Sequence, residues 1–186
     1  LTMFIGIMLA GGLGFVAPGG AAFLPILTAQ ILWINLVTDG APALALGVDP
    51  SSGDIMQRPP RALNEPVIPR RMWIFIGLVG VVMMVGTLGI LEAYYPGGLL
   101  TLFQPPTDAA HTADFARTVA FTTLMLFQCF NALNSRSGRQ SIFRLGFFGN
   151  RWLWGAIALS VGLHALVIYV PALQAAFETL PMRPVD

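Results

Sequence analysis

Hydrophobic residues along the chain fall into long segments, which are separated by stretches rich in Gly, Pro and Arg. Two of these segments, Met72–Leu91 and Trp152–Val170, contain no Asp, Glu, Lys or Arg. At about 1.5 Å per residue, each can cross roughly 30 Å of hydrocarbon as a helix. The pattern therefore predicts an all-α integral membrane protein, a polytopic helical bundle of about five transmembrane segments. The predicted segments are residues 1–17, 24–47, 72–92, 115–134 and 152–170.

The composition agrees with a membrane protein. Hydrophobic residues make up 55% of the chain and charged residues 10%, whereas about 25% of the residues in a soluble domain are charged. The single cysteine, Cys129, excludes an internal disulfide and a cysteine-based zinc cluster. With a net charge of +1 and no basic stripe interleaved with aromatics, the chain gives no indication of a nucleic-acid partner. The lipid bilayer is the expected partner.

Arginine supplies every basic residue, and its distribution predicts the topology. Four arginines lie in residues 48–71 and four in residues 135–151, whereas residues 93–114 contain none. By the positive-inside rule, the two arginine-rich loops are cytoplasmic, and residues 93–114 and 171–186 are exoplasmic. The chain begins inside an apolar run and ends soon after a Pro-containing stretch, so we expect it to be a fragment of a longer protein.

A polar cluster interrupts the second segment. Asn35, Thr38 and Asp39 are spaced i, i+3 and i+4, which places them on one face of a helix. An ionised Asp in hydrocarbon costs several kcal/mol unless it is paired or coordinated. Amide, hydroxyl and carboxylate oxygens are hard ligands that suit Ca²⁺, Mn²⁺ or Na⁺. Gly40 and Pro42 are expected to break the helix just beyond and to free the Thr38 carbonyl, as in transporters with discontinuous helices.

Other segments have to complete such a site, because Ca²⁺ usually takes 6–8 oxygens. Gln128 in the fourth segment is the candidate, although it can equally serve as an inter-helix hydrogen-bonding group. The alternative for Asp39 is that it only pairs neighbouring helices. We expect His164 to be a packed, hydrogen-bonded histidine and Glu92 to lie at the exoplasmic interface.

Four stretches of the sequence together resemble the membrane region of type II P-type ATPases, with the calcium pumps as the nearest branch. They are "QILWINLVTDGAPALALGVDP" (30–50), "DIMQRPPR" (54–61), "FNALNSRSGRQSIF" (130–143) and "LHALVIYVPALQAAF" (163–177). On this resemblance, residues 1–17 are the end of the fifth transmembrane helix, and residues 24–47, 72–92, 115–134 and 152–170 are the sixth to ninth. Residues 48–71 form the cytoplasmic coupling loop, and residues 171–186 lead to a tenth helix outside the sequence.

The resemblance implies a P-type Ca²⁺-transporting ATPase that exports cations from the cytosol. The family forms an aspartyl-phosphate in cytoplasmic domains that bind Mg-ATP, and these 186 residues contain no Asp-Lys-Thr-Gly motif. The chain is thus expected to be the transport part of the pump and to be inactive alone. The cation, the bilayer and the remaining helices and domains of the same pump are its implied partners.

The family's ion ligands carry over to Asn35, Thr38 and Asp39. Asp39 matches the position that bridges two calcium sites, and Asn35 favours a calcium-type over a sodium–potassium-type pump. Gln128 replaces a glutamate of the two-site pumps, so one site is expected, with Thr38 belonging to the weakened second one. Mn²⁺ is the alternative cation. A cation transporter or channel without ATP chemistry and a membrane scaffold are the alternative functions, and the arginine-only basic complement suggests a bacterial plasma membrane.

Overall fold

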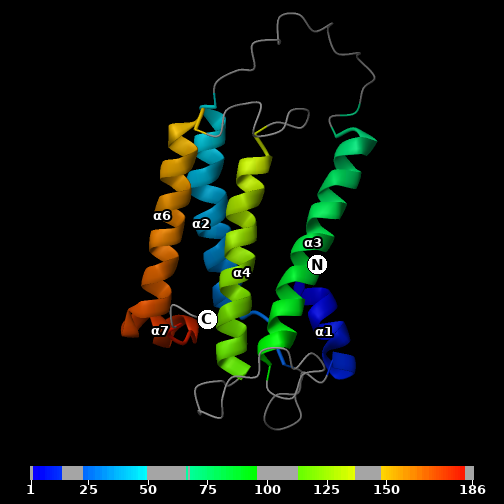
Figure 1. Ribbon diagram of the computed structural model, residues 1–186, viewed down its shortest axis with the longest axis vertical. Coiled ribbons are helices and arrows are strands. Elements are labelled where there is room, and N and C mark those ends of the chain that lie inside the picture. The colour runs from blue at the N-terminus through cyan, green and yellow to red at the C-terminus, as the bar shows by residue number, and fades with distance from the viewer. Residues whose placement is uncertain are drawn as a thin grey trace, which may run out of the picture.

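A computed structural model describes residues 2–13, 23–49, 66, 68–95, 113–136 and 148–182. Within these ranges every regular element is an α-helix (Figure 1). The helices are α1 (Thr2–Leu13), α2 (Thr28–Gly47), α3 (Arg70–Tyr94), α4 (Ala113–Asn134), α6 (Arg151–Tyr169) and α7 (Pro171–Phe177).

Local chemistry sets several helix ends. The N-cap of α6 is Asn150, whose side chain accepts a hydrogen bond from the Leu153 amide. Pro171 begins α7, a position where its fixed φ fits and its missing N–H costs nothing. The same helix ends at Glu178, which has a φ of 50° and closes the helix in the left-handed conformation.

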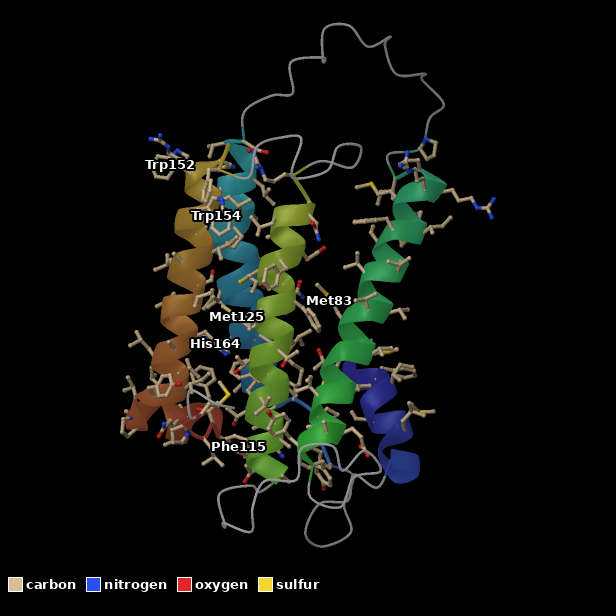
Figure 2. The ribbon with its side chains drawn as sticks, viewed as in Figure 1. Met83, Phe115, Met125, Trp152, Trp154 and His164 are labelled. Carbon is tan, nitrogen blue, oxygen red and sulfur yellow. The ribbon has the colours of Figure 1, made fainter. Side chains whose placement is uncertain are left out.

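Three helices form the centre of the bundle. In Figure 1, α2, α4 and α6 run side by side, and α7 turns across their lower end. Met125 and His164 lie within this group in Figure 2. Its buried core residues are Ile34, Val37, Ala45, Phe121, Met125, Cys129, Leu133, Leu153, Ala156, Ile157 and Val167.

The helix α3 packs against α4 and α1 through its second half only. A separate core cluster forms there, and it contains Phe23, Leu88, Leu91, Tyr95, Ala116 and Ala120. The first half of α3 diverges from α4 in Figure 1 and exposes large apolar side chains, among them Trp73, Ile74, Phe75, Leu78 and Val82. At Gly86 an added Cβ would lie 2.6 Å from the Phe127 ring, so the absence of a side chain permits the close approach.

The helix ends that border the two arginine-rich loops lie at the same end of the bundle, where α2 and α4 end and α3 and α6 begin (Figure 1). We call this the arginine-rich end. Of the described helices, α3 and α6 are long and apolar enough to cross a membrane, with a mean hydropathy of 2.6 and 1.7. Polar residues keep α2 and α4 outside that group, so five spans are not established by length and hydropathy alone.

The structure corrects two expectations. Helix α2 continues without interruption through Gly40 and Pro42, so the expected break is wrong. A proline removes one intrahelical donor, and here Pro42 is itself buried in the helix packing that keeps α2 continuous. Glu92 is 3% exposed because its end of α3 is packed in the second core cluster, and its place at the exoplasmic interface stays a prediction. The tail, for which no helix was predicted, contains α7.

Candidate functional site

The candidate site lies on α2, whose two sides differ in exposure. One side is buried against α4 and α6, and its buried residues are Gln30, Ile34, Val37, Thr38, Pro42 and Ala45. Asn35 and Asp39 lie on the other side, where both are exposed and one helical turn apart. Neither side chain makes a hydrogen bond or ion pair to another residue in the part of the chain that the structure describes.

Thr38 belongs to the buried side of α2. It is 7% exposed, and its Oγ1 donates a hydrogen bond of 2.8 Å to the Ile34 carbonyl of its own helix. The i, i+3, i+4 spacing therefore brings Asn35 and Asp39 together but places Thr38 at the boundary with the core. Because the hydroxyl oxygen still has a free lone pair, it can accept a hydrogen bond or coordinate a cation.

The backbone beside these residues offers a further oxygen. Pro42 has no N–H, so the Thr38 carbonyl lacks its usual donor four residues along the helix. One residue earlier, the Val37 carbonyl accepts a hydrogen bond of 3.0 Å from Ser160 Oγ on α6. The uninterrupted helix thus lacks one backbone hydrogen bond, between Thr38 and Pro42.

Gln128 is half-buried on α4, which packs beside α2. Its side chain makes no hydrogen bond to any other described residue. The described ranges hold no group of three or more His, Cys, Asp and Glu side chains that could bind a metal by themselves. A cation at Asp39 would have to rely on neutral oxygens and on ligands from outside these ranges.

His164 has the structural role expected from the sequence. It is 4% exposed, its Nε2 lies 3.1 Å from Thr122 Oγ1, and its ring packs on Phe121 at a centroid distance of 4.7 Å. The imidazole thus joins α6 to α4.

Sequence reasoning missed the residues that attach α2 to its neighbours. Gln30 is fully buried, accepts a hydrogen bond from the Leu27 amide at 3.1 Å and donates one to the Phe177 carbonyl at 2.9 Å. At the same end of the bundle, Arg117 donates to the Leu24 carbonyl at 3.1 Å and pairs with Asp114 at 2.9 Å. A glutamine inside an apolar run was the available signal for the first of these contacts.

The opposite, arginine-rich end of α2 has attachments of its own. Asp49 pairs with Arg136 beyond the end of α4, and the side chain of Asn150 donates a hydrogen bond of 2.8 Å to the Ala45 carbonyl. These contacts join residues about a hundred positions apart, which no local pattern reveals.

Comparisons with known proteins identify the family. A family model described as "Cation transporting ATPase, C-terminus" matches residues 23–186. The chain is 37% identical over 164 residues to a calcium-transporting ATPase of Bacillus subtilis. It is 36% and 33% identical over 162 residues to the calcium-transporting ATPases type 2C member 2 of Rattus norvegicus and type 2C member 1 of Homo sapiens.

These alignments cover 87% or 88% of this chain and 16% or 17% of each relative, so the chain spans about a sixth of their length. They confirm the resemblance drawn from the sequence motifs. The chain therefore belongs to the family formed by the C-terminal membrane region of P-type cation-transporting ATPases, and within it the chain is similar to the calcium pumps.

Proposed function

We propose that this chain is the cation-binding membrane region of an ATP-driven pump that exports Ca²⁺ from the cytosol. The observation that carries the proposal is the position of Asn35 and Asp39 on one exposed side of α2, while the other side of that helix is sealed against α4 and α6. A carboxylate at this depth in a membrane needs a partner. A transported cation, with further ligands from the rest of the pump, is the partner that fits a carboxylate beside an amide oxygen.

Asp39 supplies the central negative charge and Asn35 a side-chain oxygen in this proposal. Thr38 and Gln128 complete or border the site with neutral oxygens, a set that favours one cation over two. Ca²⁺ is preferred to Mn²⁺ because the similar relatives are named calcium-transporting ATPases.

Transport requires the site to alternate between two states of different affinity. Phosphorylation in the catalytic domains of the whole pump, which bind Mg-ATP, would shift α2 relative to the helices that supply the other ligands. The missing hydrogen bond at Pro42 lets α2 bend next to Asp39 at low cost, so the ligands can separate there. The proposal places the pump in the plasma membrane of a bacterium, in accord with its arginine-only basic residues and its similarity to the Bacillus subtilis protein.

The test uses the full-length protein reconstituted in lipid. After brief incubation with labelled ATP and Ca²⁺, Mn²⁺, Na⁺ or chelator, acid-stable and alkali-labile phosphoprotein is counted. We expect label with Ca²⁺ and its loss in Asp39→Asn, whereas Asn134→Ala, which removes an exposed amide at the end of α4, keeps it.

Label that requires Mn²⁺ in place of Ca²⁺ would change the cation and keep the pump. Absence of label with every cation, together with cation flux into vesicles, would replace the pump by a transporter that needs no ATP. The ordered family match over residues 23–186 favours the pump.

A further inference from the structure

The arginine-rich end of α2 is held by a half-buried ion pair. Asp49 follows the last turn of α2, and Arg136 follows the last turn of α4. The Nη2 of Arg136 lies 3.1 Å from Asp49 Oδ1, and its Nε lies 3.2 Å from Oδ2. The side chain of Arg136 is 5% exposed and that of Asp49 is 16% exposed, so this fork-shaped contact is largely withdrawn from solvent.

Asn150 adds a second attachment at the same end. Its Nδ2 donates to the Ala45 carbonyl in the last turns of α2 at 2.8 Å, and its Oδ1 accepts from the Leu153 amide in the first turn of α6 at 3.0 Å. The side chain is 2% exposed. One amide therefore attaches the end of α2 to the beginning of α6, and both contacts are buried.

These contacts affect the candidate site because α2 connects the two. Asp39 lies ten residues before Asp49, which is about 15 Å along an α-helix. A helix held at one end can rotate or bend about that end, and the position of Asp39 depends on where the end is held. If the end is released, α2 samples more positions, and only a fraction of them presents Asp39 and Asn35 correctly. The apparent cation affinity falls by that fraction.

We propose that Asp49 and Arg136 are positioning residues for the cation site, which hold the end of α2 against α4 so that the cation-free protein already presents Asp39 in its binding position. This inference rests on the proposed function. The pair does not touch the cation, and it acts through the direction and placement of α2. Because the pair is largely withdrawn from solvent, removal of Arg136 leaves the Asp49 carboxylate without this partner in a half-buried position.

The experiment measures cation-dependent phosphorylation from ATP in the full-length pump as the free Ca²⁺ concentration is varied. Phosphoenzyme formed from inorganic phosphate and Mg²⁺ in a Ca²⁺ chelator, which needs a folded protein and no transported cation, normalises each variant. Arg136→Ala should lower the apparent Ca²⁺ affinity roughly tenfold and leave the normalised maximal phosphorylation within about twofold of wild type. Arg136→Lys keeps the positive charge and loses the fork-shaped contact. Its apparent Ca²⁺ affinity should lie between those of wild type and Arg136→Ala.

Arg151→Ala is the matched control. It removes the same charge at the same end of the bundle from an exposed residue at the start of α6, and it should leave the affinity unchanged. Asp49→Asn should also lower the apparent Ca²⁺ affinity. The double variant Asp49→Asn/Arg136→Ala should have the same apparent Ca²⁺ affinity as Arg136→Ala alone, because both changes break one contact.

Wild-type affinity in Arg136→Ala, or an equal loss in Arg151→Ala, would overturn the positioning role while leaving the proposed function intact. If Arg136→Ala does not fold, the same test applies to Arg136→Lys and Asp49→Asn: wild-type Ca²⁺ affinity in both would overturn the positioning role. A wild-type protein that is phosphorylated from ATP without any transported cation overturns the proposed function instead, and the positioning role with it.

Discussion

Helices α2 and α3 run through the same bundle and differ in what determines their positions. Helix α3 is apolar over almost its whole length, and its second half packs on α4 and α1 while its first half exposes apolar side chains. Helix α2 has polar residues at both ends and in the middle. Side chains of Gln30, Asp49, Arg136 and Asn150 make directional contacts that attach it to α4, α6 and α7.

The comparison shows two ways of placing a helix in a membrane protein. In hydrocarbon, apolar surface gains little from packing on another apolar helix, so α3 depends on close approach at small residues such as Gly86. Helix α2 depends on hydrogen bonds and an ion pair, which specify rotation and register because their geometry is narrow. The helix that carries the candidate ligands is the one whose orientation is specified this way.

The largest expected effect on this comparison comes from Asn150. Asn150→Ala removes the N-cap of α6 and the donor to Ala45, and it should lower the free energy of unfolding by about 2–3 kcal/mol. Asn150→Ser keeps a capping oxygen and loses the bond to α2, so it should cost about half as much. Unfolding of the full-length protein in mixed micelles, followed by tryptophan fluorescence, measures both. An equal loss in Asn134→Ala, at an exposed position on α4, would mean that any amide loss has this effect.

A smaller effect on stability is expected where α3 approaches α4 closely at Gly86. Gly86→Leu places a side chain against the Phe127 ring and should cost about 2 kcal/mol through overpacking. Gly77→Leu is the matched control on the same helix, because an added Cβ there meets no atom within 4 Å, and it should change stability by less than about 0.5 kcal/mol. The same unfolding measurement applies. Equal costs at the two positions would show that the close approach to α4 does not hold α3.

The smallest effect tests a single hydrogen bond in the middle of α2. Ser160→Ala removes the donor to the Val37 carbonyl and should cost about 0.6 kcal/mol, the usual size for such a bond between membrane helices. Ser135→Ala, in an exposed turn at the end of α4, is the control and should be neutral. A cost above about 2 kcal/mol would mean that this one bond outweighs the attachments at the ends of α2.

Local pattern was sufficient for the long helices and for naming the candidate ligands, but not for α7 or for the surroundings of those ligands. The uncharged run of α3 and the spacing of Asn35 and Asp39 depend only on neighbouring residues, and both are readable from the chain. The spacing also placed Thr38 with them, whereas the structure turns its side chain into the packing with α4 and α6. A helical periodicity gives relative angles around a helix, and only the neighbouring helices decide which angles are buried.

The expected break at Pro42 illustrates the same limit. A proline predicts the loss of one backbone hydrogen bond, and that prediction follows from covalent structure. Whether the helix then bends depends on packing, and here Pro42 is buried in a helix that stays continuous. The sequence by itself therefore determined the helical class and the family and named the polar residues of the candidate site, because these rest on composition, order and short-range spacing. Only the tertiary structure decided that Asn150 and the Asp49–Arg136 pair hold the end of α2, because those contacts join residues 105 and 87 positions apart and exist only once the helices have packed.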